Sequence, residues 1–421
     1  MIVVSTLLVL LAILGAPLFA IIAASAMLGF SRDGTDLITV ATEILGIADL
    51  QFLTAIPLFT FAGYLLSQSK APQKLVRVTR AVIGWMPAGL AVVSLATCAL
   101  FTAFTGASGV TIIALGALLY PALKRDGYPE GFSLGLITAS GSLGLLFAPS
   151  LPLILYGVIA EVPIDHLFLA GILPGILMIA MLSGWSMWVS RGNRQMISKF
   201  SWAELRAALR ESIWELPLPI VVLGGIYSGY FAVSEIAAIT ALYVFIVEVL
   251  ILRDIKFMML PEIMRSAMVL VGAILIILSV SLASTEYMIS AEIPQSLLAW
   301  VSSAVSSQVS FLFLLLAFLL LLGAILDIFS AIVLVVPLII PIAAGFDIHP
   351  IHLGIVFLAA MELGYLTPPV GLNLFISSHR FEQPILQVYS ATFPFLIILL
   401  LSVILIAFWP GLSLWLVPTG R

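Results

Sequence analysis

Leu326-Asp327-Ile328-Phe329-Ser330 opens a stretch that closes, at residues 361–373, with Met-Glu-Leu-Gly-Tyr-Leu-Thr-Pro-Pro-Val-Gly-Leu-Asn. It sets an acid, prolines, glycines and hydroxyl groups inside apolar runs, where each lowers stability unless a partner or a ligand satisfies its polar atoms. A weaker copy, about 220 residues earlier, aligns Leu143-Gly144 with Leu363-Gly364 and Pro149 with Pro369. Two apolar segments broken at matching places in two halves predict a transport site near the membrane midplane.

The composition predicts an integral membrane protein. Of the 421 residues, 62% are hydrophobic and only 9% are charged, far from the balance of a soluble globular chain. A net charge of −4 gives no basic surface for nucleic acid. The lone cysteine, Cys98, lies in an apolar run and is interpreted as a small core side chain.

Spanning helices need roughly 20 apolar residues, and this length locates the predicted crossings. They lie near residues 2–30, 53–69, 131–160, 167–190, 214–233, 235–252, 265–286, 351–378 and 386–417. The first has no basic residues before its apolar run, so we interpret it as a retained helix rather than a removed signal peptide.

Two long apolar blocks remain, at 81–121 and 297–345, and small or polar residues interrupt each near its middle. Basic residues flank the first block on both sides, which predicts that both its ends are cytoplasmic, and no Lys or Arg flanks the second closely. Each arm is too short to span a membrane and long enough for a half-helix. We therefore predict two re-entrant hairpins that enter from opposite sides, with the N-terminus cytoplasmic and the C-terminus periplasmic.

The order of these segments repeats along the chain. Residues 1–190 form a first repeat containing hairpin 81–121 and broken helix 131–160. Residues 235–421 form a second repeat containing hairpin 297–345, broken helix 351–378 and a last helix. The linker 191–234 carries an extra crossing, which would invert the second copy relative to the first. The predicted fold is an all-α integral membrane protein with inverted repeats and two re-entrant helical hairpins.

The interruption of the first block puts hydroxyl groups and glycines where two half-helices would turn. Helix ends leave backbone groups unpaired, and glycine lets that backbone approach an ion. Together with the break in helix 131–160, the tip would make an oxygen-lined site for a hard monovalent cation. The alternative is close helix packing through small residues. The tip spans residues 105–111 and the break residues 141–152.

The second site pairs the tip of the second block with the break in helix 351–378. An acid deep in an apolar segment is a functional candidate, so Asp327 is its strongest residue, although it could equally cap the following half-helix. Glu362 either pairs structurally or lies near the ion path. The residues of this second site are Gly323, Asp327, Gly364, Thr367, Gly371 and Asn373.

Half-helix N-termini that face the midplane also offer positive dipole ends to an anion. We expect a carboxylate substrate between the two tips, held by backbone amides and bound cations because no Arg or Lys is buried there. The residues expected around it are Thr105, Gly106, Ala107, Ser330, Pro368 and Pro369.

Gly106-Ala107-Ser108-Gly109 also matches the Gly-x-Ser-Gly pattern of rhomboid-type intramembrane proteases. Such an enzyme would use Ser108 with a base within hydrogen-bond reach, and no histidine is expected at membrane depth. The pattern is short, so this is a distant alternative. A phosphate loop of the GxxxxGK[ST] type is missing from the sequence, which argues against ATP use by the chain itself.

The chain resembles the large membrane subunit of the tripartite ATP-independent periplasmic (TRAP) transporters, the DctM-like family. The resemblance covers nearly the whole length. It rests most on 362–374, and also on 104–111, 121–127, 141–152 and Leu326-Asp327 with its following prolines.

This resemblance implies a sodium-coupled importer subunit for small organic acids, such as a C4-dicarboxylate or sialic acid, in the bacterial inner membrane. It implies an elevator mechanism, more than one sodium ion at the two sites, and no enzyme activity, organic cofactor or transition metal. For the first sodium site, the resemblance implies Ser108, Gly109, Gly141, Ser142 and Pro149. The implied partners are a periplasmic substrate-binding protein and a small four-helix membrane subunit, expected as a separate chain. The alternatives are a stand-alone divalent-anion/sodium symporter of the same superfamily and a membrane scaffold or channel.

Overall fold

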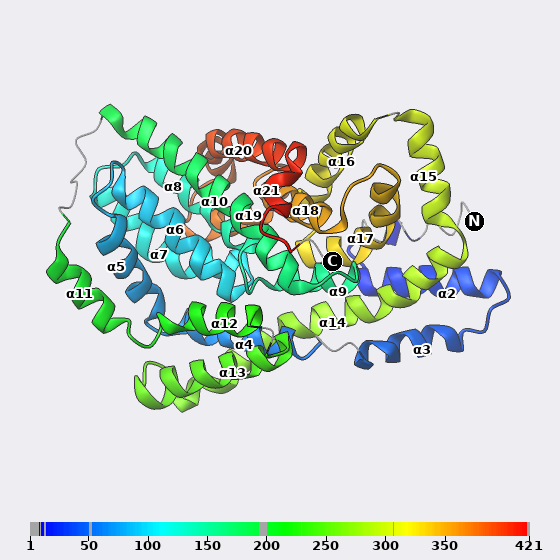
Figure 1. Cartoon of the computed structure of the whole chain (residues 1–421), viewed down its shortest axis with the longest axis horizontal. Coiled ribbons are helices and arrows are strands. Elements are labelled where there is room, and N and C mark those ends of the chain that lie inside the picture. The colour runs from blue at the N-terminus through cyan, green and yellow to red at the C-terminus, as the bar shows by residue number, and fades with distance from the viewer. Residues whose placement is uncertain are drawn as a thin grey trace.

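The computed structural model describes residues 8, 10–11, 14–49, 53–192, 200–228, 230–305 and 307–418. Over this part of the chain the regular structure is entirely helical, which confirms the predicted all-α class (Figure 1). The predicted crossing at 2–30 lies partly outside the described residues. Its described portion includes α2 (Leu18–Arg32), which α3 (Ile38–Gly46) follows.

Several helices have the length and apolar composition to cross a bilayer. In the described part of the chain these are α10 (Ile164–Val189), α13 (Val233–Phe245) with the turn that extends it to Ile251, α14 (Leu260–Ser290), α17 (Ile328–Gly345) and α20 (Ile385–Phe408). A shorter apolar helix, α4 (Ala55–Gln68), packs against α13 and α14. The chain is therefore a multi-pass membrane protein.

Each apolar block contains two helices joined by a short turn. In the first, α6 (Gly89–Thr105) and α7 (Ser108–Arg125) meet at two residues. In the second, α16 (Gln308–Gly323) and α17 meet at four. We call residues 106–107 the first tip and residues 324–327 the second tip.

The helix pairs differ from the predicted blocks in length and in limits. Helix α17, with 18 residues, is long enough to cross a bilayer, although each arm was predicted to be too short. A separate helix, α5 (Ala71–Ile83), holds residues 81–83, so the first pair starts at Gly89 and runs past residue 121. Another separate helix, α15 (Ile293–Ala304), holds the start of the second block. The sequence analysis places α15 and α16 in one apolar block because the residues between them, 305–307, carry no charge.

Both helices that were expected to be broken are broken. In the first, α8 (Glu130–Ser140) leads through a 3₁₀ turn at Leu143–Leu146 to α9 (Leu151–Ile159). In the second, α18 (Pro350–Gly364) is followed by a non-helical segment and α19 (Leu372–Arg380). Cis peptide bonds precede Pro149 and Pro369.

The helix order α4–α10 recurs as α14–α20 at an offset of about 220 residues. Between the two series lie α11 (Trp202–Glu211), α12 (Pro217–Tyr227) and α13. With 11 residues and a rise of 1.5 Å per residue, α12 is about 17 Å long. That is shorter than the full crossing predicted at 214–233.

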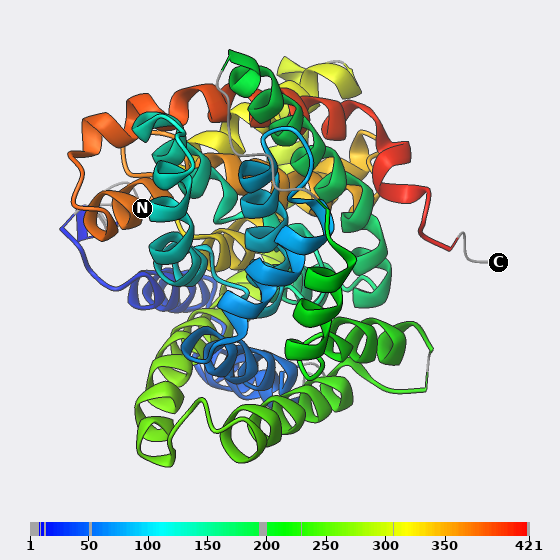
Figure 2. The ribbon, with the colours of Figure 1, turned by 90° about the vertical axis from the view of Figure 1, so that its left-hand side faces the viewer.

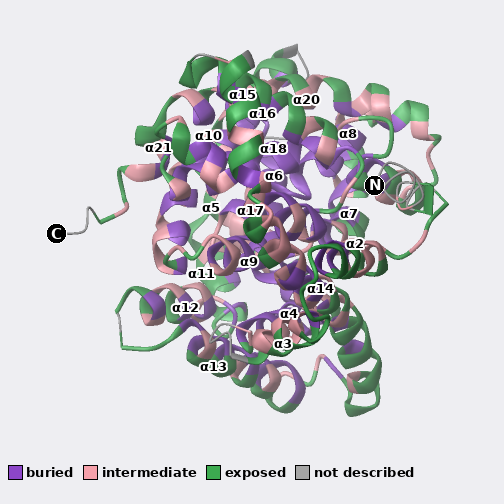
Figure 3. Cartoon of the chain, turned by 90° about the vertical axis from the view of Figure 1, so that its right-hand side faces the viewer, coloured by how far each residue is buried: buried purple, intermediate pink, exposed green. Residues whose placement is uncertain are grey.

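The protein core surrounds α18, of which every residue from Ile351 to Gly364 is buried. Helices α10, α16, α17 and α20 pack around it, and buried residues gather in this region (Figure 3). By contrast, α4, α13 and α14 run along one side of the molecule (Figures 1 and 2). This side layer and the two helix pairs form the walls of the cavity described next.

Candidate functional site

A cavity of about 420 Å³ lies between the two tips and the side layer. The first tip and the start of α7 line it on one side, and residues 327–329 on another. The side layer contributes Tyr64 of α4 and apolar residues of α14, including Ile274. Residues of the two breaks and of α19 complete the lining: Leu145, Tyr365, Leu372 and Ile376. Of the predicted site residues, the cavity brings together Gly106, Ala107, Ser108, Gly109 and Asp327.

The backbone of the first tip requires glycine at one position. Gly106 has a φ of +64°, and a Cβ there would lie 2.6 Å from Cγ of Leu151, so a larger residue would clash with the start of α9. Ala107 has an extended backbone, and its side chain caps no amide of α7. The first N–H groups of α7 at Ser108 and Gly109 therefore carry the positive end of the helix dipole at the cavity wall.

The second tip differs because a carboxylate caps its helix. Oδ1 of Asp327 accepts hydrogen bonds from the backbone N–H groups of Phe329 and Ser330, both at 3.0 Å, and Oδ2 accepts one from Oγ of Ser330 at 2.5 Å. The hydroxyl of Tyr365 accepts a bond from N of Ile328 at 2.7 Å. Asp327 thus caps α17, and it also lines the cavity. Its role as an ion ligand stays a prediction. Ser330 is buried behind it and does not reach the cavity.

The second tip is seated directly on the second break. A Cβ on Gly364 would lie 2.6 Å from Cα of Gly323, so only glycine permits this approach. N of Gly371 donates to O of Ala324 at 3.1 Å. A Cβ on Gly371 would lie 2.9 Å from O of Thr367 and 3.0 Å from O of Tyr365, which shows that backbone oxygens converge here. These predicted residues therefore do meet in space.

The first break is held by hydroxyl groups of the first helix pair. Oγ1 of Thr102 lies 2.9 Å from O of Gly141 and 2.7 Å from Oγ1 of Thr111. Thr102 is not among the predicted site residues. The sequence offers one signal for this residue, because Thr102 lies one helical turn before Thr105 on the arm that leads to the tip.

Asn373 lies against the first broken helix, although the sequence analysis grouped it with the second tip. Helix α19 packs on α7 and α8, and Nδ2 of Asn373 donates to O of Thr138 at 3.4 Å. Thr138 also donates to Oγ of Ser377 at 2.9 Å. Thr138 and Ser377 were missed because a contact across some 235 positions leaves no local pattern in one sequence.

Several buried oxygens in this region have no hydrogen-bond partner among the described residues. They are Oγ1 of Thr105, Oγ of Ser150, Oδ1 of Asn373 and both carboxylate oxygens of Glu362. Hydroxyl, amide and backbone oxygens are the ligands that hard cations prefer. The donor set near the tips therefore fits a monovalent hard cation.

The other predicted residues lie close to the tips but away from the cavity wall. Oγ1 of Thr367 donates to O of Leu363 at 3.0 Å, inside the second break. Ser142 is buried next to Gly141. Pro149, Pro368 and Pro369 lie in the two breaks, and O of Pro369 accepts a bond from Tyr389 at 2.8 Å. Among the described residues, the cavity lining includes no Arg, Lys or His.

Comparison with known proteins gives a family match across the chain. Residues 3–412 match the family model described as "Tripartite ATP-independent periplasmic transporter, DctM component". The "C4-dicarboxylate TRAP transporter large permease protein DctM" of Pseudomonas aeruginosa is 33% identical over 363 residues, covering 86% of this chain and 85% of that protein.

Other relatives have different named substrates. The "Ectoine/5-hydroxyectoine TRAP transporter large permease protein UehC" of Ruegeria pomeroyi is 29% identical and covers 97% of this chain and 96% of its own length. The "Isethionate TRAP transporter permease protein DctMQ" of Oleidesulfovibrio alaskensis is 30% identical, covering 84% of this chain and 56% of its own length.

Among solved structures, the fold is similar to the YdaH transporter of Alcanivorax borkumensis. The TM-score is 0.65 with 16% sequence identity, covering 90% of this chain and 89% of that one. At this identity the likeness concerns the fold alone.

Proposed function

Since the chain belongs to the DctM component family of the tripartite ATP-independent periplasmic transporters, we propose that it is the large permease of a sodium-coupled, binding-protein-dependent importer for small organic acids. It would act in the bacterial inner membrane. The observation that carries this proposal is the cavity whose walls come from the tips of both helix pairs and from α14.

An organic acid would bind with its negative group toward the start of α7. Both helix starts point their dipoles at the tips, but Asp327 already satisfies the amides of α17. Ala107 leaves those of α7 without a side-chain cap. An anionic group can therefore accept bonds from the α7 amides without displacing a protein carboxylate.

Sodium would be carried with the substrate by oxygens at the two tips. Near the first tip, Thr105 and Asn373 offer buried oxygens that lack a partner. Near the second, Asp327 and the converging carbonyls of Tyr365 and Thr367 offer a charged and neutral donor set. These two groups support more than one sodium ion.

The mechanism we propose is an elevator. The two helix pairs enter the membrane from opposite sides and, with the broken helices, form the moving body. Helices α4, α13 and α14 form the wall against which it slides. The wall is mostly apolar where it meets the cavity, so sliding would break few polar contacts there.

A separate small membrane subunit and a soluble binding protein would complete the importer. The isethionate relative carries the composite name DctMQ, and the match with this chain covers 56% of its length. Its remaining length leaves room for the small-subunit portion that this chain would meet as a second protein.

Uptake into liposomes tests the proposal. The chain, its small subunit and its binding protein are assayed with labelled C4-dicarboxylate, ectoine and isethionate under an inward sodium gradient. We expect uptake of one of these that needs all three proteins and stops when potassium replaces sodium. Uptake without the binding protein would instead indicate the stand-alone symporter, and uptake without sodium would contradict the coupling.

A further inference from the structure

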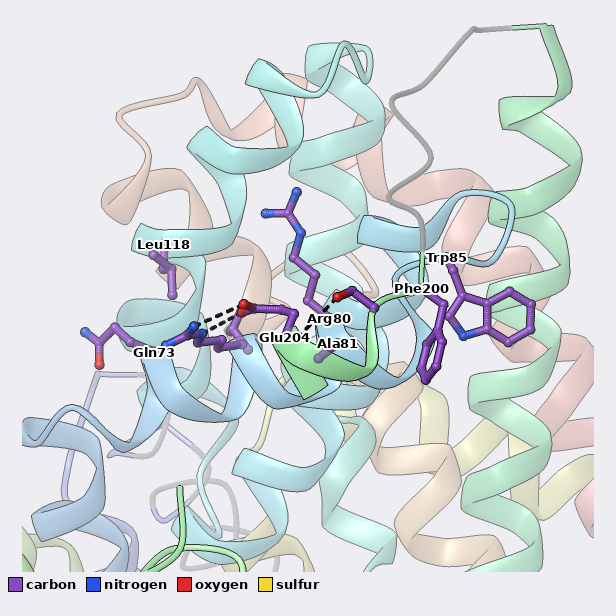
Figure 4. Close-up of a pocket in the computed structure, with 10 residues that line it drawn as sticks. Gln73, Arg80, Ala81, Trp85, Leu118, Phe200 and Glu204 are labelled. Atoms are coloured by element: carbon purple, nitrogen blue, oxygen red, sulfur yellow. Dashed lines mark hydrogen bonds and ion pairs between the residues drawn. The ribbon is translucent and has the colours of Figure 1, made fainter. Parts of the chain in front are cut away.

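A second pocket, of about 430 Å³, opens between α5 and the segment that enters α11. Figure 4 shows Gln73 and Leu118 at one end, Trp85 and Phe200 at the other, and Arg80 between them. The lining combines two arginines, one glutamate and the amide of Gln73 with apolar and aromatic walls. It lies outside the cavity between the tips and plays no part in the transport site.

The two arginines of this pocket differ in their partners. Arg77 is neutralised by α11, because its Nε lies 2.8 Å from Oε1 of Glu204 and its Nη1 pairs with Glu211. These ion pairs raise the pKa of Arg77, and the hydrogen bond from Arg77 lowers that of Glu204. Among the described residues, no carboxylate lies within ion-pair distance of Arg80. The pocket therefore holds one guanidinium whose charge no described acid balances.

Exposed aromatic side chains surround the pocket. Trp85 is 50% exposed and Phe200 42%, and Trp202, whose ring packs against that of Phe200, is 76% exposed. The indole N–H of Trp85 donates to O of Val82 at 2.7 Å, so its ring is left as an apolar surface. Tryptophan concentrates where the bilayer meets water, and the basic flanks of α5 and α11 indicate the cytoplasmic leaflet, which is the anionic one.

We propose that this pocket binds the phosphate of an anionic phospholipid, with Arg80 as its main cationic ligand. A planar guanidinium forms paired hydrogen bonds with phosphate oxygens, and the amide of Gln73 can donate another. Val76 and Leu118 supply an apolar wall for the glycerol and the first acyl carbons. These walls and the exposed rings favour an amphipathic ligand over free phosphate.

The position of the pocket gives the lipid a consequence for the fold. Helix α5 connects α4, which belongs to the wall of the transport cavity, to α6, which leads to the first tip. A headgroup held between α5 and α11 would stiffen this connection. The protein would then require an anionic lipid, and a neutral lipid that forms a bilayer of the same thickness would not replace it.

Native mass spectrometry of the full chain tests the proposal by titrating phosphatidylglycerol and phosphatidylcholine into delipidated protein. We expect wild type to retain phosphatidylglycerol more tightly. Arg80→Gln should weaken that binding about fivefold, the effect of one basic residue at an anionic surface. The matched control Arg206→Gln removes the same charge from α11 outside the pocket and should bind as wild type does.

Three results would overturn the proposal. They are equal phosphatidylglycerol affinity in wild type and Arg80→Gln, equal losses in Arg80→Gln and Arg206→Gln, and displacement of the lipid by soluble glycerol phosphate at the same concentration. If Arg80→Gln does not fold, Arg80→Lys and Trp85→Ala replace it. Arg80→Lys should keep the preference for phosphatidylglycerol, whereas Trp85→Ala should weaken binding of both lipids. The site would also be rejected if Arg80→Lys lost the preference for phosphatidylglycerol and Trp85→Ala bound both lipids as wild type does.

Discussion

Asp327 has two roles that one substitution can separate. Its carboxylate caps α17 through Phe329 and Ser330, and it also lines the cavity between the tips. Asparagine caps helices about as well as aspartate but carries no charge. Replacing Asp327 with Asn therefore keeps the helix cap and removes the negative charge of the proposed ion ligand.

Replacing Asp327 with Asn should leave thermal stability in sodium-free buffer close to that of wild type and remove most of the stabilisation that sodium adds. A ligand at about 100 times its Kd stabilises the folded state by roughly 2.7 kcal/mol. Thermal unfolding is measured while sodium replaces choline at fixed ionic strength. Asp347→Asn, at the other end of α17, is the control and should respond to sodium normally. A normal response in Asp327→Asn would reduce this residue to a cap.

Asn373 tests the first site. We expect Asn373→Leu to lower the apparent sodium affinity about tenfold, or roughly 1.4 kcal/mol, because it removes the unpartnered Oδ1. The readout is the midpoint of the same sodium titration. Ser377→Ala removes a neighbouring hydroxyl outside the proposed ligand set and should keep the wild-type midpoint. Identical midpoints for all three proteins would exclude Asn373 as a ligand.

At the scale of helices, the two breaks are positioned by glycine contacts that no other residue permits. Gly364 and Gly323 hold the second break against the second tip with backbone on backbone. Gly144 approaches O of Ala99 in α6 in the same way, since a Cβ there would lie 2.2 Å from that oxygen. Each break can therefore pack this closely only because its glycine has a hydrogen atom in place of a side chain.

Gly364→Ala should destabilise the chain by roughly 1–3 kcal/mol, because the added methyl group meets the backbone of Gly323 and neither helix can yield freely. Gly272→Ala in α14 is the control, since nothing lies within 4 Å of its Cβ position. It should be neutral or stabilising by about 0.5–1 kcal/mol. Thermal unfolding in detergent measures both, and equal midpoints would show that the Gly323–Gly364 contact is loose in solution.

The helical class, the family, the interrupted blocks and the places where helices break could all be predicted from the sequence. Prolines and glycines inside apolar runs have local causes that one sequence displays. The separation of α15 from α16, the short length of α12 and the position of Asn373 could not. Each depends on packing partners distant in the chain, such as Thr138 for Asn373.

At the scale of the whole molecule, the cavity joins two parts that the elevator proposal treats as separate bodies. Val110 belongs to the first helix pair and Ile274 to α14, and both line the cavity. A covalent link between them would hold the pair against the wall.

We expect Val110→Cys with Ile274→Cys, in a Cys98→Ala background, to lose transport when mercuric ion bridges the two thiols and to regain it on reduction. Each single-cysteine variant is the control and should keep its own transport rate in mercuric ion. Uptake into liposomes measures transport, and mass spectrometry verifies the bridge. Full transport by the bridged protein would contradict sliding of one body against the other.

The burial of α18 also bears on how this protein is made. Every residue from Ile351 to Gly364 is enclosed by protein, including His352 and Glu362, so this helix never faces lipid in the finished fold. Ionisable side chains such as these are costly in contact with lipid. Helices α16 and α17 leave the ribosome before α18, and both contact it. Membrane insertion of α18 therefore depends on neighbours that are already in place, and α20 completes its enclosure afterwards.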